Sequence, residues 1–295
     1  GTVTNIADRK SRQMLHKAKK MNPDAIVVGA GCYVQTKEAE ALLDDTVDIV
    51  IGNNKKHELL AMIEAYENDH GKCGNVIDIN HEKQEYEEMF LERTAEHTRA
   101  FIKVQDGCNN FCAYCTVPYA RGNSRNIPIS EVLEQARRIA GTGIKEIVIT
   151  GVNTGDFGRT TGESFLDLLK RLNDVEGIER YRISSIEPNL ITEDIVDWIA
   201  SGTKFQPHFH IPLQSGSDTI LKRVGRRYTT EFFADRIDYI RSRMDPKAGQ
   251  DDKPFVFFGI DVIAGLPGET EELFEETYSF LKDRVRPAFI HVFPY

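Results

Sequence analysis

The sequence predicts an α/β fold in which a partial (β/α)6 barrel follows a smaller parallel α/β domain. Six strand-like runs occur after residue 98, and five helical patterns separate them. Strands that alternate with helices form parallel sheets, and a full eightfold barrel would need more chain. A strongly charged stretch with weak periodicity, residues 67–97, is the expected linker. We therefore expect an N-terminal domain over 1–66 and the barrel over 98–295.

The smaller domain is expected to begin with a basic helix, because lysines and arginines surround a few apolar residues there. Short apolar runs and helical patterns then alternate. In chain order we expect a helix over 4–20, a strand over 25–29, a helix near 36–44, a strand over 47–51 and a helix over 56–66. Cys73 follows in the charged region, where a Gly-rich turn predicts a loop thiol.

The barrel strands are predicted from apolar, β-branched runs. They are expected at 100–104, 146–150, 181–184, 208–211, 256–263 and 289–293. The helices between them are expected near 129–140, 163–172, 191–200, 229–243 and 270–283. In barrels of this type the chemistry takes place at the carboxyl ends of the strands. The residues that follow each strand are therefore the candidates for binding and catalysis.

Three cysteines, Cys108, Cys112 and Cys115, follow the first barrel strand directly. Three thiolates within eight residues can hold three irons of a [4Fe–4S] cluster and leave the fourth iron open to another ligand. Thiolates also bind zinc, but no histidine or cysteine follows at the spacing of a zinc knuckle. This spacing, with the aromatic Tyr114 before the last cysteine, resembles the signature of the radical S-adenosylmethionine (SAM) enzymes.

Small and polar residues follow the next strands. They are Gly151, Asn153, Ser185, Glu187 and Gln214. A glycine at a strand end lets a ligand approach the backbone closely, and hydroxyl, amide and carboxyl groups can meet the polar parts of SAM. The same residue types also build the turn into a helix. For each single residue the two interpretations carry equal weight.

Four positive charges lie within residues 222–227, and Arg226 is one of them. They form either a solvated helix end or a patch on the barrel rim for the SAM carboxylate or a phosphate backbone. Arg121 and Arg125, beyond the cysteines, fit the same description. His208 and His210 are expected to be one packed and one barrel-facing residue rather than a metal pair.

The composition limits the function classes. The net charge of −9 argues against a broadly basic nucleic-acid binder, so contacts to nucleic acid must come from local patches. No stretch approaches the roughly 20 apolar residues of a membrane span, and we expect no membrane partner. Five cysteines, three of them clustered, indicate reduced thiols, and we expect a cytoplasmic protein.

Several motifs occur in an order that resembles the radical SAM methylthiotransferases. They are TVTNIADRKSR (2–12), GCYVQ (31–35), the cysteine loop (106–115) with PYARG (118–122), SSIEP (184–188), HIPLQSGS (210–217) and GLPGET (265–270). Within this family the chain is most similar to the bacterial branch that acts on N6-threonylcarbamoyladenosine beside the tRNA anticodon. The resemblance covers nearly the whole chain.

The resemblance implies that a methylthio group is added to C2 of this nucleoside by 5′-deoxyadenosyl radical chemistry. The cofactors implied are SAM and a [4Fe–4S] cluster on Cys108, Cys112 and Cys115. The implied SAM contacts are Tyr114, Gly151, Asn153, Ser185, Glu187, Gln214 and Arg226. The implied partners are the tRNA anticodon stem-loop and an electron donor such as flavodoxin or ferredoxin.

Members of this family carry a second, auxiliary [4Fe–4S] cluster on three N-terminal cysteines, and Cys32 matches the third of them. The other two would lie before Thr2, and the family continues past Tyr295 into a small RNA-binding domain, so we expect a fragment of a longer protein. Two alternatives stay open. One is a radical SAM methylthiotransferase of isopentenyladenosine in tRNA or of a ribosomal protein side chain. The other is a non-catalytic iron–sulfur or zinc RNA-binding module.

Overall fold

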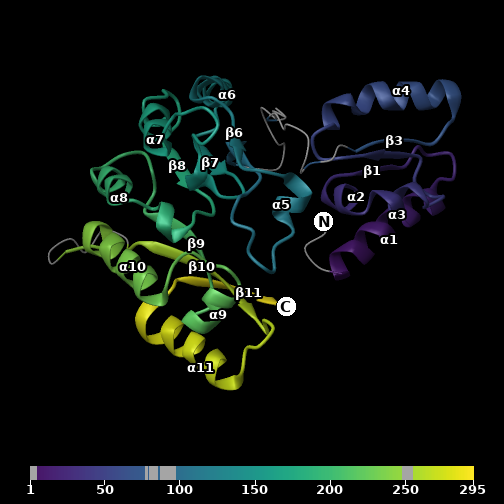
Figure 1. The fold of residues 1–295 in the computed structure, drawn as a ribbon. Helices are drawn as coiled ribbons and strands as arrows, with labels where there is room; N and C mark the ends of the chain where they lie inside the picture. The colour runs from purple at the N-terminus through teal and green to yellow at the C-terminus, as the bar shows by residue number, and fades with distance from the viewer. Residues whose placement is uncertain (1–4, 77–78, 80–85, 87–97, 248–254) are drawn as a thin grey trace. The chain divides into compact units, whose positions relative to one another are not determined.

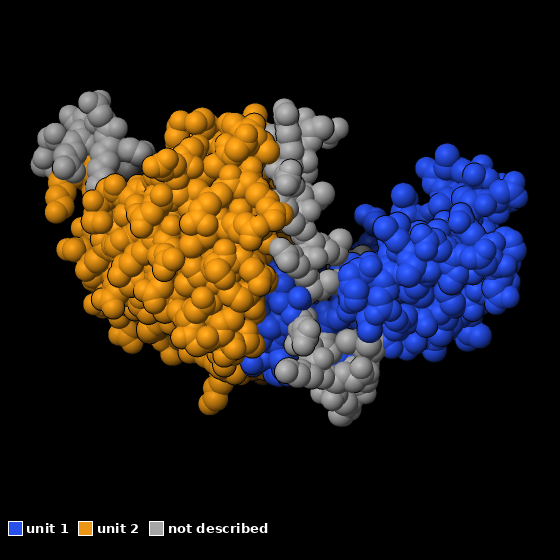
Figure 2. Space-filling model, turned by 90° about the horizontal axis from the view of Figure 1, so that it is seen from above, with its two compact units in different colours: residues 1–89, 107–125 blue, residues 90–106, 126–295 orange. Residues whose placement is uncertain are grey.

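The computed structural model of the protein describes residues 5–76, 79, 86, 98–247 and 255–295. The chain forms two compact units, which Figure 2 colours separately. Unit 1 comprises residues 1–89 and 107–125, and unit 2 comprises residues 90–106 and 126–295. The clustered cysteines thus belong to unit 1, although the chain on either side of their loop belongs to unit 2.

Unit 1 is a small α/β unit with a parallel sheet, as predicted (Figure 1). Its helices are α1 (Asn5–Met21), α2 (Cys32–Thr36), α3 (Glu38–Leu42), α4 (Leu59–Asp69) and α5 (Val117–Arg121), with a 3-10 turn at Lys56–Glu58. Its strands are β1 (Val28–Ala30), β2 (Ile49–Ile51) and β3 (Cys73–Asn75), in the order β1-β2-β3.

Two predictions for unit 1 were wrong. The helix near 36–44 is two short helices, α2 and α3, because Lys37 between them has φ −137° and breaks the helical conformation. Cys73 is the first residue of β3 and pairs with Ile49 rather than lying in a loop. The strand consists of Cys, Gly and Asn, so no apolar alternation indicated it. Most of the predicted linker over 67–97 lies outside the described residues.

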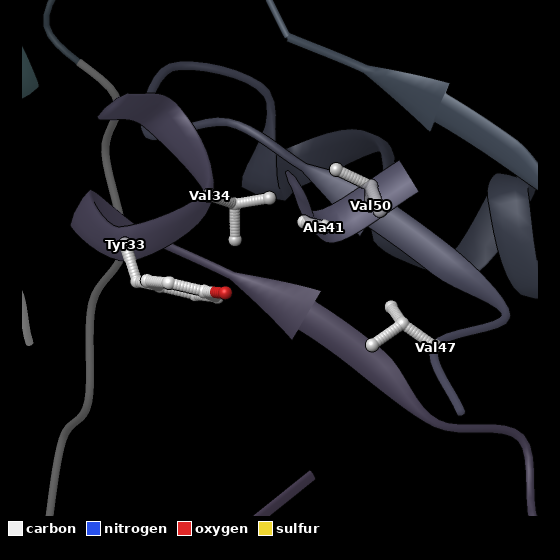
Figure 3. Close-up of a cluster of buried hydrophobic side chains, with 5 residues drawn as sticks. All are labelled: Tyr33, Val34, Ala41, Val47 and Val50. Carbon is white, nitrogen blue, oxygen red and sulfur yellow. The ribbon is translucent and has the colours of Figure 1, made fainter. Parts of the chain in front are cut away.

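The core of unit 1 is a cluster of five buried side chains from the helices and the sheet. They are Tyr33, Val34, Ala41, Val47 and Val50, each at most 4% exposed (Figure 3). The helix pair α2–α3 supplies the first three, so this short interrupted segment is held by its buried face rather than by its length.

Asp48 connects three segments of unit 1 through hydrogen bonds. Its carboxylate accepts hydrogen bonds from the Val27 amide at 2.7 Å, from Lys19 Nζ at 2.9 Å and from the Tyr66 hydroxyl at 2.9 Å. Burial raises the pKa of Asp48, but these three donors outweigh it and hold the pKa below its usual value. The ionised carboxylate therefore stabilises the unit.

Unit 2 contains the six predicted strands. They are β4 (Ala100–Lys103), β7 (Glu146–Thr150), β8 (Arg180–Ile183), β9 (His208–Gln214), β10 (Phe257–Ala264) and β11 (Phe289–Pro294). They form two parallel sheets, β4-β7-β8 and β9-β10-β11, and isolated parallel bridges at Tyr181–Phe205 and Ser185–His210 join them. The strands thus follow one another in chain order, as a partial (β/α)6 barrel requires. Among the described strands β4 and β11 are the two edges, so the barrel is open.

The helices of unit 2 lie between these strands in the chain. They are α6 (Ile129–Gly141), α7 (Phe165–Asn173), α8 (Glu193–Ala200), α9 (Asp218–Arg223), α10 (Thr230–Met244) and α11 (Glu271–Ser279), which continues as a π-helix over Phe280–Val285. Four of them start at a serine or threonine whose hydroxyl accepts a backbone N–H of the first turn. These caps are Ser164, Thr192, Thr229 and Thr270. Such caps fix where each helix begins.

In the first half of β9 one face is buried and the other is not. Phe209 and Ile211 on β9 are at most 1% exposed, whereas His208 and His210 are half-buried on the opposite face. The prediction that one of these histidines is packed away from the other was wrong. Residues two apart on a strand share a face, so the two imidazoles lie on the same side. No helix in the described part of the chain is long and apolar enough to span a membrane.

Candidate functional site

The cysteine loop runs from β5 (Gln105–Asp106) to β6 (Arg125–Asn126), two short strands that pair with each other. Backbone and side-chain hydrogen bonds close it independently of the thiols. The Cys108 amide donates to the Gly122 carbonyl at 3.0 Å, and the Ser124 amide donates to Asn109 Oδ1 at 3.0 Å. The two ends of the loop are therefore held together by groups other than the thiols.

Gly107 is required where the loop begins. It has φ +72°, and a Cβ there would lie 2.1 Å from the Asn123 carbonyl oxygen. Any side chain would push the two ends of the loop apart. Phe111 also has a left-handed backbone, with φ +51°, an unusual conformation for a bulky residue. Such local strain is found where surrounding structure holds a functional segment in place.

The three thiols are arranged around a tight turn. The Cys115 amide donates to the Cys112 carbonyl at 2.9 Å, Cys112 is buried, and Cys108 and Cys115 are half-buried. Tyr114 is half-buried in the same turn. Three partly shielded thiols on a hydrogen-bonded loop fit the donor set of an iron–sulfur cluster, which cysteine thiolates hold.

Cys32 lies close to this loop within unit 1. It is the first residue of α2, and Asn53 connects it to α5, the helix that follows the three cysteines. Asn53 Nδ2 donates to Cys32 Sγ at 3.4 Å and to the Ala120 carbonyl at 2.5 Å. Unit 1 therefore brings all four predicted metal-binding cysteines into one unit, three on the loop and one on a helix against it.

Arg125 does not form a surface patch, contrary to the sequence interpretation. It is 4% exposed, and its guanidinium donates to the carbonyls of Arg121 at 2.7 Å and Asn123 at 3.2 Å and to Asn54 Oδ1 at 2.8 Å. Its position near the end of the cysteine loop explains this burial. The guanidinium supplies hydrogen-bond donors to carbonyls of the cysteine loop.

In unit 2 three of the predicted residues form one network. The Asn153 amide donates to Gln105 Oε1 at 2.9 Å, and Asn153 Oδ1 accepts the Glu187 amide at 3.4 Å. The Glu187 carboxylate pairs with Arg226, whose guanidinium also donates to the Pro212 carbonyl at 3.2 Å. The network thus joins the carboxyl ends of β7, β8 and β9.

The Glu187–Arg226 pair is buried. The two side chains are 12% and 4% exposed. Burial raises the pKa of Glu187, and the positive charges of Arg226 and Arg227 oppose it. Tyr228 packs against the pair. The guanidinium carbon of Arg226 lies 4.9 Å from the centroid of the Tyr228 ring, and the Tyr228 hydroxyl donates to the Pro212 carbonyl at 2.5 Å. Removing either charge would leave the other buried without its partner.

The remaining strand-end residues differ in what they do. Gly151 packs against Gln105, whose atoms would lie 3.0–3.2 Å from an added Cβ, so packing alone explains this glycine. The Ser185 carbonyl accepts the Thr154 hydroxyl at 2.8 Å. Gln214 has φ +70°, in the left-handed region that a β-carbon disfavours. Backbone strain of this kind clusters at functional sites, which keeps Gln214 among the candidate residues.

The sequence did not predict three residues whose hydrogen bonds hold the carboxyl ends of the strands in place. Gln105 is fully buried between the first strand and the cysteine loop, and Tyr228 and Thr154 bind the carbonyls of strand ends. A glutamine directly after the strand-like run 100–104 was the available signal for the first. The others follow turns, where no periodicity distinguishes a hydrogen-bonding side chain from a solvated one.

Residues 102–281 match the model of the radical SAM superfamily, which is more than half of the chain. The solved structure of the radical SAM methyltransferase TsrM from Kitasatospora setae has a TM-score of 0.68 and 16% identity, and the match covers 97% of this chain and 58% of that one. At this identity the similarity shows the fold alone. The fold and the cysteine loop thus define a radical SAM protein, a class that uses a [4Fe–4S] cluster and SAM, and the predicted fold class is confirmed.

The chain is 42% identical over its whole length to the threonylcarbamoyladenosine tRNA methylthiotransferase MtaB of Bacillus subtilis, of which it covers 63%. It is 40% identical over its whole length to the protein of the same name from Aquifex aeolicus, of which it covers 69%. The chain therefore spans about two thirds of the length of these relatives. It belongs to the radical SAM tRNA methylthiotransferase family.

Proposed function

We propose that the protein adds a methylthio group to C2 of N6-threonylcarbamoyladenosine next to the tRNA anticodon. The observation that carries this proposal is the identity of 40–42% along the whole chain to two relatives named for that nucleoside. The cysteine loop of unit 1 supports it, because a radical SAM enzyme needs three thiolates on a folded loop.

Cys108, Cys112 and Cys115 would hold the SAM-binding cluster. With SAM, that cluster supplies a 5′-deoxyadenosyl radical, and the chain contributes binding, orientation and shielding. Cys112 is buried, and a hydrogen bond between the Cys108 amide and the Gly122 carbonyl closes the loop that would present the thiolates. The partial burial of the three cysteines would limit access of water to a bound cluster.

The strand-end residues would serve SAM in two ways. Glu187 and Arg226 neutralise each other, so we assign them a positioning role: they fix the backbone after β8 and β9. Asn153 belongs to the same network. Gln214, held in a strained conformation, is our candidate for a direct contact to SAM. Tyr114, Gly151 and Ser185 remain proposed contacts, the latter two through backbone groups.

Cys32 would contribute one thiolate to an auxiliary cluster. Three cysteines hold that cluster in this family, so two further thiolates are needed. The Asn53 side chain supports this role, because its N–H donates to Cys32 Sγ at 3.4 Å and such hydrogen bonds stabilise a thiolate. We further propose a low-potential electron donor such as flavodoxin or ferredoxin as a partner, and the anticodon stem-loop as the substrate.

The test is the nucleoside content of tRNA from cells that lack the gene and carry a plasmid copy. The wild-type gene should restore the 2-methylthio form of N6-threonylcarbamoyladenosine, as measured by mass spectrometry. Cys115→Ser should not restore it, whereas the matched variant Cys73→Ser, at a cysteine of β3, should. Restoration of methylthiolated isopentenyladenosine instead would show that the substrate belongs to the other tRNA branch.

A further inference from the structure

His210, Asp261 and His291 form a cluster in unit 2 that the proposed function does not use. One residue comes from each of the adjacent strands β9, β10 and β11. His210 Nε2 lies 2.7 Å from Asp261 Oδ1, and His291 Nδ1 lies 3.0 Å from the same oxygen. The three atoms all lie within 4.8 Å of one another.

The strand register creates this cluster. Asp261 and His291 are direct partners across β10 and β11, and His210 is the partner of Gly259, two residues before Asp261 on the same face. The neighbours Ile260 and Val262 point to the buried face, at 0% and 5% exposed. The three polar side chains therefore share one face of the sheet without depending on any loop.

We propose that His210, Asp261 and His291 bind a divalent transition-metal ion. Two imidazoles and one carboxylate are the donor set of protein sites for Zn²⁺ and Fe²⁺, which keep further positions open for water or another ligand. With metal–ligand bonds of about 2.1 Å, adjacent ligands at right angles lie about 3.0 Å apart. The two nitrogen–oxygen distances of 2.7 and 3.0 Å are close to that value, so a metal ion needs only small side-chain shifts.

Charge and accessibility suit such an ion. One carboxylate with two neutral imidazoles carries a single negative charge, which attracts a divalent cation. The side chains are 27%, 17% and 44% exposed in the order His210, Asp261 and His291, so an ion can enter from solvent. Each neutral imidazole would present the lone pair of the nitrogen that faces Asp261 to the ion and carry its one proton on the other nitrogen, as metal-bound histidines do.

This site is distinct from the cysteine ligands of the proposed iron–sulfur cluster. Its ligands are nitrogen and oxygen atoms of unit 2, whereas the thiols belong to unit 1. A consequence is that iron added during cluster reconstitution would also occupy this site. The iron content of the wild-type protein should then exceed that of His291→Ala by about one ion per chain, with no change in sulfide.

The direct test is equilibrium dialysis of the cluster-loaded protein against Zn²⁺ alone, with metal counted by mass spectrometry. The wild type should bind about one more zinc per chain than His291→Ala or Asp261→Asn, or bind it at least tenfold more tightly. His57→Ala removes an exposed histidine of unit 1 and should bind like the wild type. Zinc on other thiols is the same in all four proteins, so it cancels in the comparison.

The two site variants are chosen so that unit 2 stays folded. His291 lies on the edge strand β11, and Asp261→Asn keeps the size of the side chain. The unfolding curve of each variant, followed by the fluorescence of Trp198, shows whether unit 2 is intact. Equal zinc binding by the wild type and by both site variants, whether one ion or none, would overturn the proposal and leave the cluster as a hydrogen-bonded contact between strands.

Discussion

Replacement of Arg226 by methionine should destabilise unit 2 far more than the same change at a surface arginine. The substitution keeps an unbranched, flexible side chain, although a shorter one, and removes the guanidinium that pairs with Glu187 and donates to the Pro212 carbonyl. Because the two side chains of the ion pair are only 12% and 4% exposed, water cannot replace the lost partner. Glu187 is left as a buried, unpaired carboxylate.

The size of the effect follows from that burial. Loss of one partner of a buried ion pair costs about 3–5 kcal/mol. We expect about 3 kcal/mol, because burial already raises the pKa of Glu187 and the carboxylate can take up a proton. A raised folded-state pKa means that stability falls as pH rises from the unfolded value towards the folded one. The loss in Arg226→Met should therefore be smaller at pH 5.5 than at pH 8.

The assay is urea unfolding followed by the single tryptophan, Trp198 on α8, whose ring packs against Phe205 at 5.5 Å. The matched control is Arg284→Met, which breaks an ion pair with Asp238 whose side chains are 47% and 46% exposed. Exposed pairs contribute at most about 1 kcal/mol.

A double-mutant cycle with Glu187→Gln completes the test. The double variant should lose less than the sum of the single losses, by about 1–3 kcal/mol, since the two groups interact directly. Equal losses in Arg226→Met and Arg284→Met, or strictly additive losses at Arg226 and Glu187, would refute the view that this pair is a buried structural contact.

Three further substitutions test the cysteine loop, the role of Asp48 and the role of Gln214. Gly107→Ala should abolish stable cluster loading, because the added Cβ would lie 2.1 Å from the Asn123 carbonyl oxygen. Loading is measured by the iron and sulfide content. The control is Gly143→Ala, which also lies at positive φ but has open space around it, and this variant should load normally. Asp48→Asn should lower the stability of the cluster-free chain by about 1–3 kcal/mol at pH 7 in circular-dichroism melts. A lowered carboxyl pKa stabilises fully above the unfolded value of about 4, and this stabilisation is lost as pH falls through the folded value. The difference should therefore shrink progressively below about pH 4, and a difference that persists unchanged in acid would contradict this. Gln214→Gly should raise the free energy of unfolding by about 1 kcal/mol, because glycine adopts a φ of +70° without strain. The same variant should bind SAM more weakly in calorimetry. Unchanged SAM binding would remove Gln214 from the proposed contacts.

The strands and helices of the barrel were predictable because their signals are local. The run 256–263 is apolar or β-branched apart from Gly259 and Asp261, and β10 occupies Phe257–Ala264. Hydroxyl caps such as Thr229 precede helices that the sequence placed within one or two residues. The cysteine spacing indicated the cluster loop for the same reason: all three ligands lie within eight residues.

What the sequence did not show depends on pairing between distant segments. Asp261 lies 51 residues from His210 and 30 from His291, and only the register of three strands brings them together. Arg226 and Glu187 were predicted separately as ligand contacts, but their mutual neutralisation follows from a contact 39 residues apart. Cys73 was wrongly predicted to lie in a loop, because β3 forms through its pairing with β2 and its own residues do not favour a strand.

The measurement that tests the central claim most directly is SAM cleavage by the anaerobically reconstituted and reduced protein. We expect about four irons on Cys108, Cys112 and Cys115, a reduced-cluster paramagnetic resonance signal that changes on addition of SAM, and formation of 5′-deoxyadenosine. Cys115→Ala should lose all three. Zinc in place of the cluster, or a cluster whose signal ignores SAM and yields no 5′-deoxyadenosine, would contradict the account and return these cysteines to a structural role.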